Sequence, residues 1–504
     1  MSVICASTVR IVPPTFTVNK HRVSDVVEGT GGESMEAFAA EVRSLFEAPL
    51  RVGRLLDMSR GLQEEYREKL RESEVSMLPS YQHTLPTGKE QGDFLALDVG
   101  GSTFRLALVR LGGSVNMGQG TGLQVRRMKS LVIDKEIRGL RGQAFFDWMA
   151  DRIGDMLAEY NLINGTTDAR LDMGLAWSFP IEQTSPQSGR LQPMGKGFCA
   201  SQGIEGQDLS EIVMRSCRRR SLNVNLKAII NDGQATLLSQ AYKDPATRMS
   251  LILGTGTNAA VFMPVTALGN GKFGQRPESW HATAQRVLIN TEMSMFGKHV
   301  LPTTRWDEEL NTSHVLPDFQ PLEYLVTGRY MGEIVRLILL EAVRTVGLFD
   351  GETPRGLDEP YSLDTRILAS LHSDTSPQLA KGRDAFLHAH PLPSRPRQRE
   401  VEFLREVAIL VSRRAAAYLA VALHALWTVR TKAEGLQTDQ ASHITIACDG
   451  TIVAKYPDFR TCCQRYLDEL CASSGASRDA VKLELAPESS IFGAAVASCC
   501  LGDP

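Results

Sequence analysis

The stretch DFLALDVGGSTFRLALVRL, residues 93–111, decides the fold, because it places two apolar runs on either side of a Gly-Gly turn. Two such runs around a short glycine-containing turn are typical of a β-hairpin. Asp98 ends the first run, and the turn residues that follow are Gly100, Gly101, Ser102 and Thr103. Glycine permits positive φ, and successive backbone N–H groups in such a turn form an anion-binding concavity. The stretch predicts a hairpin, and its turn is either a phosphate cradle or an ordinary connection between strands.

The same arrangement recurs along the chain. RMSLILGTGTNAAVFM, residues 248–263, is again strand, glycine-rich turn and strand, and HITIACDGTIVAKYP, residues 443–457, predicts a third, weaker turn of this kind. The candidate phosphate residues in these turns are Gly254, Thr255, Gly256, Thr257, Asp449, Gly450 and Thr451. Helical periodicity separates the repeats, for example over residues 142–162. Strands, hairpin turns and long helices repeated in two halves predict a duplicated α/β fold with a cleft between two lobes.

Bulk properties narrow the class of protein. The 504 residues are 43% hydrophobic and 22% charged, with a formal net charge of −3, which predicts no direct binding of nucleic acid. We find no apolar run near membrane-spanning length and no secretory segment. The nine cysteines lack metal-ligand spacing, which favours reduced thiols and an intracellular, cytoplasmic protein. None of the glycine-rich turns fits the GxxxxGK[ST] pattern of a P-loop.

LKAIINDGQATLLSQAY, residues 226–242, contains the most ambiguous carboxylate. Asp232 follows an apolar run and precedes a helix that the pattern starts at Gln234. An Asp at such a junction is most often a helix cap, which satisfies unpaired amides. A catalytic base at the end of a strand is the alternative, and the local pattern leaves both open.

Many motifs in family order resemble the eukaryotic hexokinase family. They include DFLALDVGGSTFRLALVRL, SFPIEQTSPQSGRL (178–191), GKGF (195–198), INDGQATLLSQAY (230–242), LGTGTNAAVF (253–262) and INTEMSMFG (289–297). The resemblance covers nearly the whole chain and implies an actin-like ATPase (ribonuclease H-like) fold. It divides the chain into a flexible extension (1–33), a helical segment on the large lobe (34–85), a small lobe (86–230 with a C-terminal helix at 491–502) and a large lobe (231–490).

The resemblance also implies an activity, which is transfer of a phosphoryl group from ATP with Mg²⁺ to the O6 hydroxyl of a hexose such as glucose. The implied hexose-binding residues are Ser178, Lys196, Asn231, Asp232, Asn258, Glu292 and Glu323. Asp232 is the implied base and Lys196 the cation beside the phosphoryl group. Asp98 is the implied Mg²⁺ residue, acting through water, and Arg105 lies among the nucleotide residues.

Departures from the family pattern favour a second interpretation. Gly195 and Gly233 replace threonines, and Met293-Ser294-Met295 replaces Trp-Gly-Ala. Asn311 replaces an aspartate. In APESSIFGAAVAS, residues 486–498, Glu488, Ser489, Ser490 and Ile491 stand where the family has Asp-Gly-Ser-Gly. If the second of those glycines needs positive φ, Ile491 forces the loop to be rebuilt and occupies space meant for adenine.

Two functions therefore remain open. One is a working hexokinase, and the other is a catalytically weak hexokinase-like sugar sensor with regulatory protein partners. The losses lie on the nucleotide side, whereas the sugar-contact residues are present. Association with the nucleus or mitochondria stays open as well.

Overall fold

Two sheets with the same topology organise the chain. The computed structural model describes residues 34–113, 122–159, 170–195 and 197–500. The first sheet has the order β4-β3-β2-β5-β8 and consists of β2 (Gln91–Val99), β3 (Thr103–Gly112), β4 (Leu123–Val132), β5 (Leu171–Trp177) and β8 (Val224–Ile230). The second has the order β1-β11-β10-β9-β12-β13 and consists of β1 (Leu78–Pro79), β9 (Thr247–Leu253), β10 (Thr257–Pro264), β11 (Arg286–Asn290), β12 (Ile444–Asp449) and β13 (Val481–Leu485).

In both sheets the first three strands along the chain are antiparallel neighbours, and the fourth and fifth run parallel to the first. Each sheet therefore has the spatial order third, second, first, fourth, fifth, with β1 added at one edge of the second sheet. The predicted duplicated α/β fold is confirmed. Strands β6 (Ile181–Ser185) and β7 (Ser188–Leu191) form a separate hairpin.

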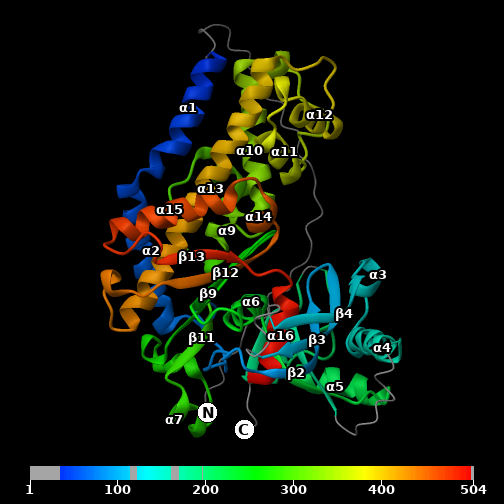
Figure 1. Ribbon diagram of the computed structural model, residues 1–504. Helices are drawn as coiled ribbons and strands as arrows, with labels where there is room; N and C mark the ends of the chain where they lie inside the picture. The colour runs from blue at the N-terminus through cyan, green and yellow to red at the C-terminus, as the bar shows by residue number, and fades with distance from the viewer. Residues whose placement is uncertain (1–33, 114–121, 160–169, 196, 501–504) are drawn as a thin grey trace, which may run out of the picture.

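Two helices lie between the sheets, side by side (Figure 1). Helix α6 (Asp232–Ala241) packs on β9 and β10, whereas α16 (Ser489–Cys500) packs on β2 and β5. The backbones of the two helices touch at Gly493, where an added Cβ would lie 2.1 Å from the carbonyl oxygen of Ala235. Glycine is required at this crossing because any larger residue would separate the helices.

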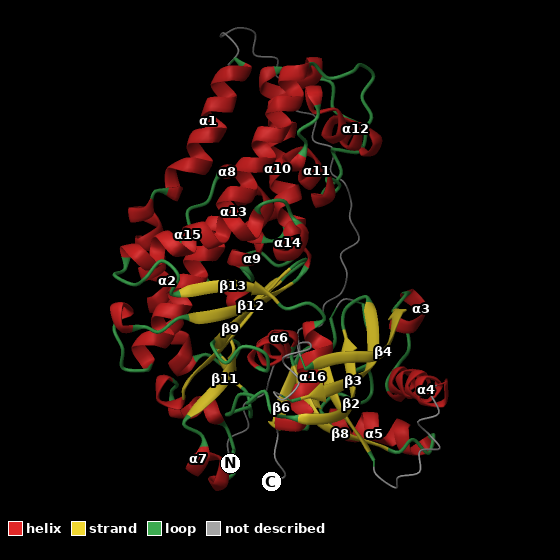
Figure 2. Ribbon diagram, in the orientation of Figure 1, coloured by secondary structure: helices red, strands yellow, loops and turns green. Residues whose placement is uncertain are grey.

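Helices surround the second sheet on its other side (Figure 2). Helices α1 (Met35–Glu47) and α2 (Val52–Glu72) contact the long α13 (Gln398–Ala433), which also contacts α10 (Gly328–Val346) and α15 (Phe459–Ser473). The others here are α7 (Glu278–Thr283), α8 (Arg305–Ser313), α9 (Pro321–Val326), α11 (Thr365–Ser373), α12 (Ala380–Ala389) and α14 (Thr451–Lys455). Helices α3 (Lys135–Arg138), α4 (Gln143–Glu159) and α5 (Leu209–Arg219) belong to the first sheet's half.

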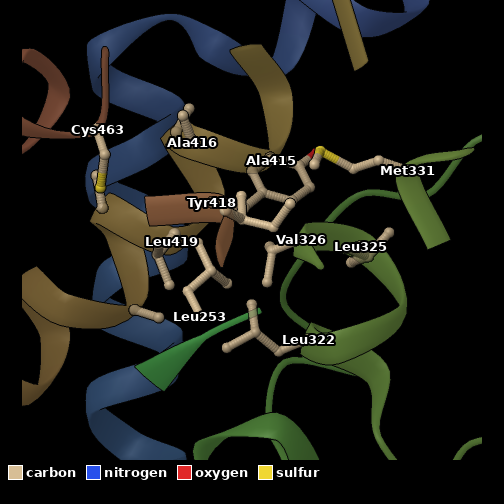
Figure 3. Packing of buried hydrophobic residues seen from close by; sticks show 14 of the residues in the cluster. Leu253, Leu322, Leu325, Val326, Met331, Ala415, Ala416, Tyr418, Leu419 and Cys463 are labelled. Atoms are coloured by element: carbon tan, nitrogen blue, oxygen red, sulfur yellow. The ribbon is translucent and has the colours of Figure 1, made fainter. Parts of the chain in front are cut away.

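Helix α13 is the centre of the larger core. By length and composition alone α13 could cross a membrane, contrary to the expectation that no apolar run approaches that length. However, 89% of its most apolar window is buried inside the protein. Figure 3 shows Leu419 of α13 packed with Leu253, which ends β9, and with Leu322 and Val326 of α9. The core therefore supports the two segments that carry the glycine turn after β9 and Glu323.

Three expectations about local structure are wrong. Strand β12 is followed by α14, so the third glycine turn joins a strand to a helix and is no hairpin. Helix α6 begins at Asp232 rather than at Gln234, and its cap is Asn231. The C-terminal helix spans Ser489–Cys500, two residues earlier than expected at its start. The predicted extension 1–33 lies outside the described residues, and the division of the chain into lobes stays a prediction.

A buried histidine in α13 predicts how stability depends on pH. The His424 Nδ1 and Nε2 atoms lie 2.8 and 3.1 Å from the hydroxyls of Ser59 and Ser474, and burial lowers the pKa of His424 to about 4. The unfolded chain therefore binds a proton between pH 6.5 and pH 4 that the folded chain does not. We expect the free energy of unfolding to fall by at most about 1.4 kcal/mol per pH unit in this window. Urea unfolding at pH 7 and pH 5 measures the change. His424→Gln should reduce it and leave the smaller part that comes from His372 and His390, whose pKa values burial also lowers.

Candidate functional site

The first glycine turn holds a buried carboxylate. The β2/β3 register places Asp98 opposite Arg105, and Arg105 Nε donates to Asp98 Oδ2 over 2.8 Å. Arg105 also forms an ion pair of 2.9 Å with Glu488, just before α16. The backbone N–H of Ser178, at the end of β5, donates to the carbonyl of Val99 over 3.2 Å. The predicted sugar-binding serine therefore lies beside the first turn.

The second and third glycine turns lie against each other. A Cβ added to Gly254 would lie 3.5 Å from both the backbone nitrogen and the hydroxyl of Thr451. Gly450 has φ 117°, and a Cβ there would lie 2.2 Å from the carbonyl oxygen of Leu253. Only glycine fits this position, because L-residues rarely adopt that φ and the β9 backbone blocks a side chain. Thr255, at the tip of the second turn, is exposed.

The start of α6 resolves the ambiguity about Asp232. Asn231 caps the helix through its Oδ1, which accepts from the Gln234 N–H over 2.7 Å, and the Gln234 side chain completes a capping box. The capping role therefore belongs to Asn231 and not to Asp232. The Asp232 carboxylate accepts from the Gly233 N–H over 2.8 Å and occupies the first turn of the helix, where negative charge is favoured.

Amide and carboxylate side chains from the second sheet and from α9 form the next part of the candidate site. Asn258 Nδ2 donates to Asn290 Oδ1 over 2.8 Å, and Asn290 Nδ2 donates to Glu292 Oε1 over 2.7 Å. Glu292 has φ 50°, a left-handed conformation that is uncommon outside glycine. Glu323 Oε2 accepts from the backbone N–H of Thr257 over 3.1 Å, so the second turn is tied to α9. Asn290 lies within the motif INTEMSMFG, but the sequence predicted no role for it.

The charge of Asp232 acts on two other carboxylates of the candidate site. Burial raises the pKa of Glu292, the hydrogen bond from Asn290 lowers it, and the negative charge of Asp232 raises it. Burial also raises the pKa of Asp98, Arg105 lowers it, and the charges of Asp232 and Asp449 raise it. Glu292 follows β11 of the second sheet and Asp98 lies on β2 of the first, so the charge of Asp232 acts on residues of both halves.

A magnesium ion and a nucleotide fit this arrangement. Asp98 is buried among other carboxylates with Arg105 as its ion-pair partner, so a divalent cation would offset the local negative charge. Among the described residues no three His, Cys, Asp or Glu side chains form a metal cluster. Mg²⁺ usually keeps several waters and is bound through one or two carboxylates and substrate phosphates, and Asp98 is the carboxylate that would hold it here.

Ser489 links the third turn to α6. Its hydroxyl donates to the Asp449 carboxylate and lies 2.7 Å from the hydroxyl of Thr236, one turn after Asp232. Ser489 is fully buried. Ser489 stands where the resembled family has a glycine. The connection that it makes between Asp449 and Thr236 was not predicted, because it joins three segments that lie far apart in the chain.

The expectation about Ile491 is wrong. Ile491 lies inside α16, is fully buried, and packs in the cluster between the sheets. It does not occupy the nucleotide side, and positive φ falls instead on Glu488, at 55°. Asn311 exchanges hydrogen bonds of 2.9 Å with Asp318 and has a structural role on α8. Lys196 lies outside the described residues, so its predicted role is not placed.

The duplicated topology and the three turns define the class of the actin-like sugar kinases. Hexokinase family models match residues 42–242 and 248–500. Hexokinase-1 of Oryza sativa subsp. japonica is 32% identical over 431 residues, covering 84% of this chain and 82% of the relative, and hexokinase-1 of Saccharomyces cerevisiae is 29% identical over 428 residues, covering 84% and 83%.

The structure of a hexokinase from Schistosoma mansoni complexed with glucose superposes with a TM-score of 0.74 at 27% identity, covering 93% of this chain and all of that one. The chain belongs to the hexokinase family. The predicted family and the actin-like fold with two lobes are both confirmed.

Proposed function

We propose that the protein transfers the terminal phosphoryl group of ATP to the O6 hydroxyl of a hexose, with glucose as the first candidate. The observation that supports the proposal is the start of α6, where Asn231 takes the capping role and leaves the Asp232 carboxylate in the first turn, with its charge acting on Glu292 and Asp98. The remaining proposed hexose contacts are Ser178, Lys196, Asn231, Asn258 and Glu323. The hexose ring is held by paired amide and carboxylate groups, because buried hydroxyls require hydrogen-bond partners.

The chemistry at Asp232 is proton transfer. The carboxylate accepts the proton of the O6 hydroxyl while O6 forms its bond to the phosphorus atom and the bond to ADP breaks. Glu292, oriented by Asn290, fixes the sugar, and the Asn231 cap leaves its Nδ2 group to donate to a hydroxyl. Mg²⁺ supplies charge neutralisation of the phosphoryl oxygens, and Asp98 would hold it through water. Lys196 is proposed to face the same oxygens.

A coupled assay with ATP, Mg²⁺ and a panel of hexoses tests the proposal on the purified protein. Hexose-dependent formation of ADP supports it. ADP formation that is equal with and without hexose contradicts it, because the chain would then be an ATPase that does not use a sugar as acceptor.

Gly233→Thr combined with Gly195→Thr should raise the turnover rate. A Cβ on Gly233 would meet nothing closer than 3.7 Å, and a Cβ on Gly195 meets nothing within 4 Å, so both positions admit a Cβ without a clash. Each restores a hydroxyl near the proposed phosphoryl site, and one well-placed donor is worth on the order of 10²-fold in rate. The coupled assay should show a gain of at least about tenfold; Gly233→Ala with Gly195→Ala is the control without hydroxyls. An equal rate in both double variants contradicts the prediction.

The Ser489 connection favours the sugar-sensor alternative as a second candidate. With Asp449 bonded to Ser489 and Glu488 paired to Arg105, two segments of the proposed nucleotide side are already engaged by the chain itself. A protein of this kind would bind hexose and use ATP weakly, and it would act through regulatory protein partners.

Ser489→Gly should strengthen ATP binding, because it releases Asp449 and Thr236 from their shared partner. The expected gain is about two- to tenfold in Kd, the worth of one net hydrogen bond. Ile491→Gly is not combined with this change, because Ile491 is fully buried and its loss would open a cavity that lowers the free energy of unfolding by about 2–5 kcal/mol. Calorimetry with ATP and Mg²⁺ measures the effect, with Ser498→Gly on the same helix as control. Unchanged affinity would contradict the competition.

A further inference from the structure

A second charged site lies at the far end of the second sheet. A cavity of about 490 Å³ there is bordered by Arg248, Arg286, Arg430, Glu434, Ser442 and His443. Strands β9, β11 and β12 all start beside this arginine cavity and run to the segments of Gly254, Glu292 and Asp449. Five to seven residues of strand separate the two ends, which is about 20 Å. The arginine cavity is therefore distinct from the site described above.

Positive charge exceeds negative charge in the arginine cavity. Glu434 accepts from Arg286 over 3.0 and 2.7 Å and from Arg430 over 3.1 Å, so one carboxylate serves two guanidinium groups. Arg248 donates through Nη1 to the carbonyl oxygens of Pro245 and Thr247, at 2.6 and 2.8 Å. In the described ranges Arg248 has no ion pair within 4 Å. The nearest other carboxylate that acts on it is Asp244.

Burial makes part of this excess charge costly. The Arg430 side chain is only 11% exposed, and its pKa is lowered to about 10 by burial, with Glu434 opposing the shift and Arg248 and Arg286 acting in the same direction as burial. Burial also lowers the pKa of Arg248, Arg286 acts in the same direction, and Glu434 and Asp244 oppose it. The Arg286 side chain stays 44% exposed. Three guanidinium groups around one shared carboxylate favour an anion as a further partner.

We propose that the arginine cavity binds a small phosphate monoester. Guanidinium groups match the oxygens of phosphate in geometry and charge, and Ser442 and His443 offer further polar contacts. Leu85, Phe262 and Ile444 form an apolar wall against which the organic part of the ligand packs. The volume suits a small metabolite, since ligand pockets hold about 300–1,000 Å³.

Calorimetry with butyl phosphate on the full chain tests the proposal, because this monoester has an apolar organic part and lacks the hexose ring. We expect saturable binding that weakens at least about tenfold in Arg248→Gln, since a charge-assisted hydrogen bond is worth that much. Arg248→Lys, which keeps the charge and loses the fork, should fall between the two. Arg366→Gln, at a 90% exposed side chain, is the control and should bind as the unchanged protein does. Thermal unfolding without ligand verifies that each variant is folded.

Further arms distinguish the source of the phosphate. Inorganic phosphate should bind more weakly than butyl phosphate, because it cannot use the apolar wall, and neutral butanol should not bind. The proposal is overturned if no saturable binding occurs or if inorganic phosphate binds as tightly as the monoester. It is also overturned if Arg248→Gln leaves the affinity unchanged, or if saturating ADP and Mg²⁺ displaces the monoester, which would place it at the glycine turns.

Discussion

Asp232→Asn should lower the rate of hexose phosphorylation by about 10²–10⁴-fold, the usual contribution of a positioned general base. The asparagine retains the size of the side chain and its place in the first turn of α6, but it cannot accept the O6 proton. Stability should change little, because Asn231 and Gln234 provide the helix cap. Hexose affinity should change far less than kcat, which tryptophan fluorescence and the coupled assay measure separately.

Asp208→Asn is the matched control for this prediction. Asp208 caps α5 through the Glu211 N–H and takes no part in the proposed site, so its change should leave the rate unaltered. An Asp232→Asn protein that retains more than about a tenth of the rate would mean that another group accepts the proton. An equal loss in both variants would point to a general defect in folding.

Asp307→Asn should lower the free energy of unfolding by about 3–5 kcal/mol, as expected when one partner of a buried ion pair is removed. Arg414 Nη1 and Nη2 each donate to the Asp307 carboxylate over 2.6 Å, and the two side chains are only 1% and 3% exposed. Asp307 also accepts from the N–H and hydroxyl of Thr304. The substitution leaves the Arg414 charge buried between α8 and α13.

Urea unfolding measures this effect, and Asp364→Asn is the control. The Asp364–Arg366 pair has the same chemistry but is exposed, so its loss should be small. Replacing both partners by apolar residues, Asp307→Leu with Arg414→Met, should recover part of the stability and shows that the loss comes from the unpaired charge. A loss below about 1 kcal/mol in Asp307→Asn alone would contradict the prediction.

Strand order was not predicted, because it depends on pairing between distant segments, whereas the first two hairpins were, because apolar runs around glycine turns are local signals. The register of β2 and β3, for example, pairs Asp98 with Arg105 directly. The third turn was misjudged because Gly450 is compatible with either a strand or a helix after it, and the packing of α14 decides. Ile491 was misjudged because the predicted helix at 491–502 begins two residues earlier, at Ser489, and because the burial of Ile491 between the sheets depends on distant segments.

In the candidate site, too, local patterns left some roles open, and contacts between distant segments decided them. Asp232 remained ambiguous in the sequence, since a cap and a base use the same residue type at the same junction. The hydrogen bond from Gln234 to Asn231 removed one of the two roles. The roles of Asn290 and Ser489 were not predicted, because they depend on contacts between distant segments, which no local pattern reports.

The most direct measurement follows glucose and ATP with Mg²⁺ by phosphorus NMR on the purified protein. The account predicts that a resonance of a phosphate monoester at glucose O6 grows as ATP is consumed, and that Asp232→Asn suppresses both changes by at least about 10²-fold. The proposed phosphoryl transfer is contradicted if glucose binds but no ATP is consumed and no sugar phosphate forms, both in the unchanged protein and in the variant that carries Gly233→Thr and Gly195→Thr.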